Sequence, residues 1–237
     1  MKFFFVLLFV GLLSCVKSDL CTTAGVQACF DTSINLDIIT MAPGTLNSGG
    51  SYELVRFTDS STVHSITIAC DNAAGGVCVW DAANSKGVSY VGGVESSMFT
   101  ISFIGIIIKR GFIDNDGGGL FLRAATCSLT YVSFLACSAS EGGAIYVDPW
   151  MFSILSLFGC TFEGNDGGVA DDISFISGGG QDEVYVMPCL GGTSSSQGSE
   201  LDTNGIAFTT FSYTCTPCPT GQFSLPGEPS RAYSAFY

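Results

Sequence analysis

A pair of glycines recurs at a constant interval in the middle of the chain. Gly117-Gly118, Gly142-Gly143 and Gly167-Gly168 follow one another at steps of 25 residues. The segment 112–118 also matches 162–168 at all but two of its positions. Because no helical pattern lies between the copies, a repeat of this length predicts the coils of a parallel β-helix.

Strand-sized apolar runs surround these glycines, and turn residues separate them. The runs are rich in Val, Ile, Phe and Thr, while Gly, Asn, Asp and Ser fill the gaps between them. Charged residues make up only 12% of the chain, which favours buried strands over helices. We therefore expect an all-β solenoid with strands near 52–57, 65–70, 77–80, 98–108, 120–122, 129–134, 144–147, 151–158, 169–176 and 184–187.

In a parallel β-helix, residues one coil apart stack into columns. Phe112, Asn115 and Gly117 should each begin such a column, with inward Phe rings, inward Asn amides and glycines at positive φ. The middle copy is degenerate, since Cys137 stands where the Phe-x-x-Asn pattern has its Asn.

Two motifs carry a family resemblance. Gly-Gly-Ala-Ile at 142–145, together with Phe-x-x-Asn at 112–115 and 162–165, resembles the repeats of polymorphic outer-membrane proteins, which are pectin-lyase-like β-helices. The resemblance covers about residues 98–176. It implies a right-handed, single-stranded parallel β-helix with a surface or adhesive role, although the membrane barrel of that bacterial family has no counterpart here.

The end of the chain has a different character. Residues 214–224 resemble the start of a cysteine-rich, growth-factor-receptor-like module, which normally continues through further cysteines. We expect a signal peptide at 1–18, an N-terminal cap at 19–50, the β-helix at 51–189, a Gly/Ser-rich loop and last strand at 190–213, and a truncated Cys-rich tail at 214–237.

The first residues predict export. Lys2 precedes an apolar stretch that is too short to cross a bilayer, and small residues follow it, as in a secretory signal peptide. The alternative is a loose lipoprotein box that would make Cys15 a lipid anchor. No later stretch has the length of a membrane helix. We thus expect a secreted or cell-surface protein, probable only as a monomer on sequence grounds.

The charge balance limits the partners. Eight Lys and Arg stand against 21 Asp and Glu, a formal net charge of −13. Such a charge repels nucleic acid and disfavours polyuronates unless cations bridge the two. An extracellular glycan or protein ligand is the partner we expect.

Ten cysteines follow the predicted leader, which suggests disulfides in an exported chain. Cys21 with Cys29 and Cys70 with Cys78 are the most favourable local pairs, while Cys127 fits a buried thiol. The further candidates for disulfides are Cys137, Cys160, Cys215 and Cys218. For Cys215-x-x-Cys218 a disulfide is favoured over half a zinc site, because no second ligand pair follows.

One acidic position repeats with the glycine pairs. Asp116, Glu141 and Asp166 precede the three pairs at the same step, so three carboxylates are expected along one edge. Weak Ca²⁺ binding is one hypothesis for this edge, and ordinary turn chemistry is the alternative. No other cofactor is indicated.

A catalytic site is less evident than a binding surface. Asp171 and Asp172 are the candidate acid and base of a polysaccharide lyase or hydrolase, but adjacent strand residues point to opposite faces. His64 is the only histidine. Trp80, Tyr90, Tyr146 and Trp150 are aromatic residues that would stack on sugar rings if they were exposed. We expect a binding, adhesive or structural β-helix, with a carbohydrate-active enzyme as the alternative.

Overall fold

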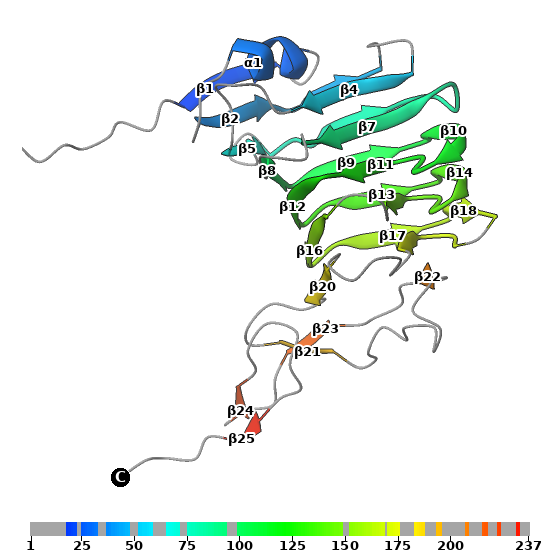
Figure 1. The fold of residues 1–237 in the computed structure, drawn as a ribbon. Helices are drawn as coiled ribbons and strands as arrows, with labels where there is room; N and C mark the ends of the chain where they lie inside the picture. The colour runs from blue at the N-terminus through cyan, green and yellow to red at the C-terminus, as the bar shows by residue number, and fades with distance from the viewer. Residues whose placement is uncertain are drawn as a thin grey trace, which may run out of the picture.

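The computed structural model describes residues 18–22, 25–32, 37–47, 52–58, 65–71, 75–93, 99–148, 152–168 and 170–175, together with short strands between 183 and 232. Within these segments the strands are stacked as a β-solenoid of mostly parallel strands (Figure 1). No helix of the described segments is both long enough and apolar enough to cross a membrane. His64, Trp150, Cys189 and Cys218 lie outside the described residues.

Three long sheets and one short sheet form the walls of the solenoid. Sheet A contains β1 (Ser18–Thr22), β2 (Asp37–Ala42), β5 (Ser65–Cys70), β8 (Phe99–Ile104), β12 (Ala125–Thr130), β16 (Ile154–Phe158) and β20 (Glu183–Met187). Sheet B contains β3 (Gly44–Leu46), β6 (Cys78–Asp81), β9 (Ile106–Lys109), β13 (Ser133–Leu135) and β17 (Thr161–Glu163). Sheet C contains β4 (Glu53–Thr58), β7 (Gly87–Gly92), β11 (Leu120–Arg123), β15 (Ile145–Val147), β19 (Ile173–Phe175) and β22 (Ala207–Phe208). Sheet D contains β10 (Phe112–Asp116), β14 (Ser138–Glu141) and β18 (Asp166–Gly167).

Two further antiparallel pairs follow the solenoid in the chain. β21 (Thr193–Ser195) pairs with β23 (Cys215–Pro217), and β24 (Gln222–Phe223) pairs with β25 (Arg231–Ala232). At the other end, β2 and β3 lie in the region expected to form a cap, and they are already strands of sheets A and B.

The core forms because strand residues alternate between the inside and the outside. In sheet A, one inward column runs through Ile39, Ile68, Phe103, Leu129 and Leu157, which are successive register partners and at most 2% exposed. Columns of this kind fill the solenoid with side chains and leave the outward residues of each strand to make the surface.

A short helix covers the first coil. α1 (Val26–Thr32) places Phe30 edge-on against Phe57, with ring centroids 4.9 Å apart, and near Phe99 at 6.1 Å. These contacts close the N-terminal end of the core (Figure 1), as expected for a region that must cover open strand edges.

Single residues in the left-handed conformation turn each coil at two corners. Gly105, Tyr131 and Gly159 make the corner between sheets A and B, with φ between 54° and 68°. Arg110, Ala136 and Gly164 make the next corner, with φ between 51° and 62°. Because non-glycine residues occupy several of these places, the corners leave only part of their pattern in the glycine content of the sequence.

Gly117 and Gly142 have a stricter requirement. Both have positive φ, 71° and 60°, and a Cβ on Gly142 would lie 2.0 Å from the carbonyl oxygen of Ile145. Only glycine fits where the chain passes so close to itself. The left-handed turn predicted at the first two glycine pairs is therefore confirmed.

The predicted columns are only partly correct, because the coils differ in length. Phe162 lies on Phe134, with centroids 5.2 Å apart and planes within 5° of parallel, at a separation of 28 residues. The coil from Leu120 to Ile145 has 25. Phe112 is instead a partner of Ser138 and is 43% exposed, so the expectation that it begins an inward Phe column is wrong.

The two Asn residues of the repeat differ accordingly. The Asn165 side chain accepts a hydrogen bond from the Cys137 amide at 3.0 Å and donates to the Phe134 carbonyl oxygen at 3.3 Å. Asn165 thus joins one coil to the next, as predicted. Asn115 is exposed on β10 and does not share that column, which corrects the expectation that both amides point inward.

Both predicted local disulfides are present. Cys21 is bonded to Cys29, and Cys70 to Cys78. Cys137 and Cys160 are free thiols, which corrects their place among the disulfide candidates, and Cys127 is a free buried thiol as expected. Each points into the packed interior of a coil. Cys215 belongs to β23, and nothing further is described of its side chain.

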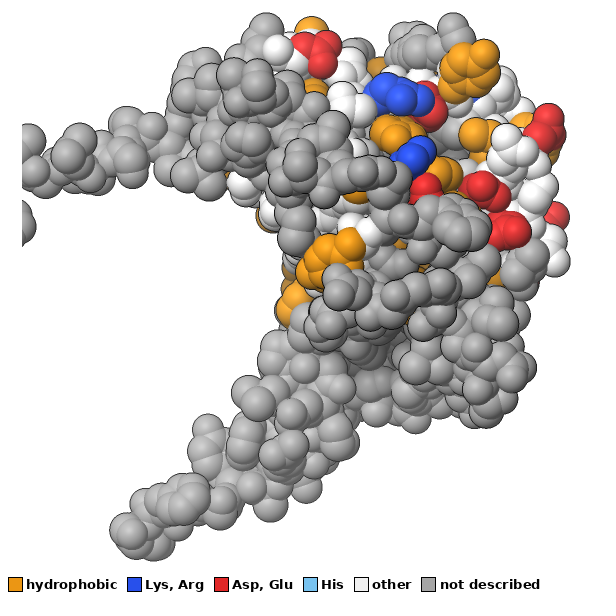
Figure 2. Space-filling model, in the orientation of Figure 1, with side chains coloured by type: hydrophobic (Ala, Val, Ile, Leu, Met, Phe, Trp, Pro, Cys, Tyr) orange, Lys and Arg blue, Asp and Glu red, His pale blue; other side chains and the backbone are white. Residues whose placement is uncertain are grey.

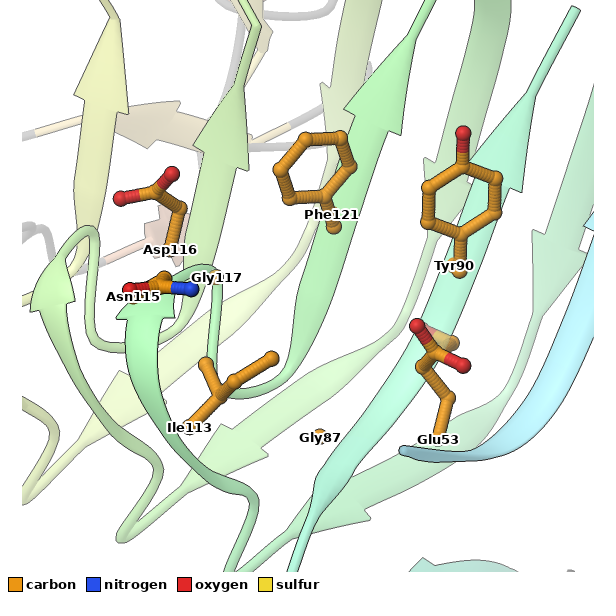
Figure 3. Close-up of a pocket in the computed structure, with 9 residues that line it drawn as sticks. Glu53, Gly87, Tyr90, Ile113, Asn115, Asp116, Gly117 and Phe121 are labelled. Carbon is orange, nitrogen blue, oxygen red and sulfur yellow. The ribbon is translucent and has the colours of Figure 1, made fainter. Parts of the chain in front are cut away.

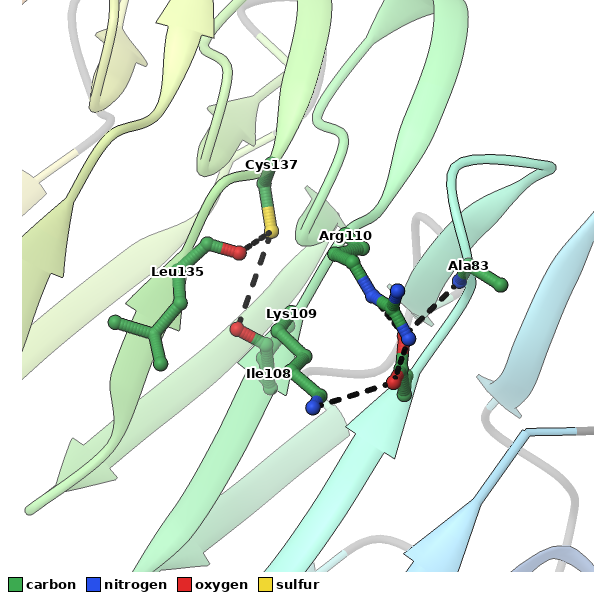
Figure 4. A network of polar contacts seen from close by, with 7 residues as sticks. Ala83, Ile108, Lys109, Arg110, Leu135 and Cys137 are labelled. Carbon is green, nitrogen blue, oxygen red and sulfur yellow. Dashed lines mark hydrogen bonds and ion pairs between the residues drawn. The ribbon is translucent and has the colours of Figure 1, made fainter.

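A buried carboxylate links two coils beside sheet B (Figure 4). Asp81 on β6 accepts a hydrogen bond from the Arg110 guanidinium, Nε to Oδ1 at 2.8 Å, and lies 3.3 Å from the Lys109 ammonium. Its Oδ1 also accepts the Ala83 amide at 3.0 Å. The carboxylate is thus well paired although it is nearly inaccessible.

Candidate functional site: a groove over an aromatic ladder

The outer face of sheet C carries a column of aromatic side chains. Tyr90 on β7, Phe121 on β11 and Tyr146 on β15 are successive register partners. The ring centroids of Tyr90 and Phe121 are 5.3 Å apart and nearly parallel, and those of Phe121 and Tyr146 are also 5.3 Å apart. We call these three residues the aromatic ladder. Its step follows from the spacing of about 4.8 Å between neighbouring strands.

A cation continues the ladder at its N-terminal end. Arg56 on β4 is the register partner of Tyr90, and its guanidinium carbon lies 4.2 Å from the centroid of the Tyr90 ring. Arg56 is also paired with Glu53, at 2.9 Å. The charge of Arg56 is thereby compensated, and the cation–π contact adds about 0.5–1 kcal/mol at an exposed position.

Sheet D forms the side wall of a groove beside the ladder. A cavity of about 170 Å³ lies between them, and Figure 3 shows the Phe121 and Tyr90 rings side by side, with the carboxylates of Asp116 and Glu53 on either side. The chain reaches this wall because β10 follows the left-handed corner at Arg110. The lining consists of Glu53, Gly87, Ser89, Tyr90, Ile113, Asn115, Asp116, Gly117 and Phe121.

The groove and its surroundings are acidic. Burial raises the pKa of Asp116, and the nearby carboxylates of Glu141 and Asp148 raise it further. Burial, followed by the same three carboxylates, raises the pKa of Tyr146 to about 12. Figure 2 shows Asp and Glu side chains gathered on the side of the molecule where sheet D lies in Figure 1. A positive or neutral group is therefore favoured there over an anion.

The chemistry of such a groove is recognition of a ring-shaped polar molecule. Slipped aromatic rings offer apolar area, and the carboxylate of Asp116 and the amide of Asn115 offer hydrogen-bonding groups beside it. Small-molecule sites combine these two features. Tyr146, held protonated by its raised pKa, keeps its hydroxyl as a donor at any physiological pH.

The predicted row of three carboxylates is not formed. Asp116 and Glu141 are register partners, as expected, but Asp166 is the partner of Ser138. The reason is the longer second coil, which displaces the third acidic residue by three positions along the chain. Among the described residues, no group of three His, Cys, Asp or Glu side chains is placed to hold a metal ion.

The candidate catalytic pair lies apart from the groove. Asp172 is 5% exposed and accepts a hydrogen bond from Asn165 Nδ2 at 2.9 Å. Asp171 is exposed, and its Oδ1 accepts the Gly167 amide at 3.3 Å. The two carboxylates point to opposite sides, and each has a partner that explains it as part of the coil.

Of the aromatic residues singled out in the sequence, Tyr90 and Tyr146 belong to the ladder. Trp80 is fully buried in the core, where it packs edge-on against Phe103 at 5.4 Å. Phe121 and Asn115 escaped sequence reasoning as groove residues. Steps of 31 residues from Tyr90 to Phe121 and 25 to Tyr146 hide the column, because no constant period connects the three.

No protein-family model, curated protein or solved structure matches this chain. Function is therefore inferred from the residues of the groove.

Proposed function

We propose that the chain is an extracellular saccharide-binding protein whose site is the groove over the aromatic ladder. The observation that carries the proposal is the pair of Tyr90 and Phe121 rings lining a cavity together with Asn115 and Asp116. Sugar rings present apolar C–H faces and equatorial hydroxyls at once, and this lining suits both.

The charge of the groove narrows the ligand. Arg56 is compensated by Glu53, whereas Asp116 has an acidic surrounding and no cation among the groups that shift its pKa. A polyuronate or sulfated glycan would meet repulsion here. We propose a neutral or amine-bearing saccharide as the ligand class.

Export belongs to the same proposal. The leader at 1–18 and the two disulfides favour an oxidising compartment outside the cell. The resemblance of the Gly-Gly-Ala-Ile motif to polymorphic outer-membrane repeats favours a surface or adhesive role, and the resemblance of 214–224 to a growth-factor-receptor-like module favours a continuing extracellular segment.

The test is a binding screen of the chain without its leader against neutral, amine-bearing and uronate oligosaccharides. Tyr90→Ala and Phe121→Ala should each weaken binding about tenfold, since an aromatic contact contributes about 1 kcal/mol or slightly more. Tyr131→Asn is the matched control, because it removes an exposed ring from a left-handed corner that Asn also tolerates.

Two outcomes would contradict the proposal. One is the absence of binding to every saccharide, and the other is binding that Tyr90→Ala and Phe121→Ala leave unchanged. Release of shortened or unsaturated products during the screen would instead favour a carbohydrate-active enzyme.

A further inference from the structure

The outer face of sheet A carries two adjacent columns of hydroxyl side chains. Thr67, Ser102, Ser128 and Ser156 are successive register partners on β5, β8, β12 and β16. Ser65, Thr100 and Thr126 form the neighbouring column, two residues earlier on the first three of these strands. We call these seven residues the hydroxyl face.

The alternation of the strands turns these side chains outward. On β8 and β12 each member of the hydroxyl face is half-buried, whereas Ile101 and Cys127 between them are fully buried. Within the described part of the chain, no hydrogen bond occupies the hydroxyls of Thr67, Ser102 or Ser128. They are therefore free to bind groups outside the protein.

The face is regular in two directions. The register continues without a bulge from β5 to β16, so the columns have a step of about 4.8 Å across the strands and about 6.6 Å along them. Intervals of this size are close to those between water oxygens on the surfaces of hexagonal ice. A ligand that repeats in two dimensions can engage all the hydroxyls at once, which multiplies weak contacts.

The face is also uncharged, although the chain as a whole is strongly acidic. None of the outward residues on β5, β8, β12 and β16 is Asp, Glu, Lys or Arg. Threonine methyls lie among the hydroxyls, together with Ala69 and Ile104 at the next position along two of the strands. A surface of hydroxyls and methyls without charges holds water in order without binding salt.

We propose that the hydroxyl face binds the surface of ice. The regular spacing, the hydroxyl and methyl chemistry and the lack of charge suit crystalline water together. A crystalline polysaccharide would favour a row of flat aromatic rings, and Phe158 at one margin is the aromatic side chain found among these outward positions. The site is separate from the aromatic ladder, which lies on sheet C.

The test measures ice recrystallisation and the shape of single ice crystals in the presence of the chain without its leader, with albumin at equal concentration as reference. The wild-type protein should slow recrystallisation, facet the crystals and be incorporated into growing ice. Ser102→Tyr and Ser128→Tyr should each lose these effects, because a large side chain at the centre of the face holds the lattice away.

The control is Ser133→Tyr, which makes the same change at an outward position of β13 in sheet B and should behave as wild type. Circular dichroism and thermal melting show whether each variant keeps the fold. Wild-type protein that is excluded from ice as albumin is overturns the proposal, and so does full activity of a folded Ser128→Tyr variant. A dimer or a bound crystalline polysaccharide that Ser128→Tyr releases would assign the face to that occupant and overturn it as well.

Discussion

Asp81 and Arg110 lie on consecutive coils and are joined by paired hydrogen bonds between carboxylate and guanidinium. The Arg110 side chain remains almost half exposed, whereas that of Asp81 is nearly inaccessible. The pair therefore connects the interior of the corner with its surface, and it makes the stability of the solenoid depend on pH.

The Arg110 hydrogen bond, opposed by burial and supported by the Ala83 amide and Lys109, lowers the pKa of Asp81 from 3.8 to about 2. Because the folded pKa is depressed, the contribution is complete above pH 4 and is lost as the pH falls from about 4 to 2. Asp81→Asn should cost about 1–2 kcal/mol at pH 7, after allowance for the exposed partner, and should flatten this acid dependence. Urea unfolding between pH 2 and 7 measures both, and an unchanged pH profile would assign the acid sensitivity to other carboxylates.

Gly142→Ala should destabilise the protein far more than Gly164→Ala. Both glycines have φ near 60°, so an added methyl costs about 1–2 kcal/mol in either place. At Gly142 it would also collide with the Ile145 carbonyl oxygen, whereas the space around Gly164 is open. Ala136 already occupies the corner equivalent to Gly164 one coil earlier. Thermal melting of the two variants compares them, and equal losses would show that the collision is relieved by local movement.

The three free thiols should resist alkylation in the folded protein. Burial raises the pKa of Cys127 strongly, and burial is also the main cause that raises the pKa of Cys137 and of Cys160 to about 11. Thiolate is the reactive form, so iodoacetamide at pH 8 should modify them only after unfolding. Peptide mapping by mass spectrometry reads this out. Rapid labelling of Cys160 in native protein would mean that its coil opens locally.

Asp116→Asn should stabilise the protein while weakening the binding of an amine-bearing saccharide. The raised pKa shows that the ionised form of Asp116 is disfavoured by burial and by Glu141 and Asp148. Replacing it removes this repulsion at pH 7, and the advantage should vanish as the pH falls through the raised pKa and the wild-type carboxyl takes up a proton. Denaturation curves and binding isotherms at pH 4 to 8 test the two effects separately. Stability that falls at pH 7 would show that the carboxylate is engaged by a favourable partner.

The sequence predicted the stacking of coils but not their register. The Gly117 and Gly142 turns were recognisable, since only glycine fits where the backbone approaches itself, and so were the two disulfides between cysteines close in the chain. The match between 112–118 and 162–168 was misleading, because its Phe residues belong to different sheets. Unequal coils also concealed the aromatic ladder. Pairing between strands depends on contacts distant in sequence, which a local motif does not contain.

The three additional residues in the longer coil have a wider consequence. Phe134 and Phe162 remain stacked inside, while outside them Asp166 comes to lie beside Ser138 and leaves Glu141 without an acidic neighbour on that side. An insertion at a corner thus changes which groups meet on the exterior and leaves the packed interior in step. Solenoids of this type can accordingly acquire new surface chemistry through small changes in loop length, with little disturbance to folding.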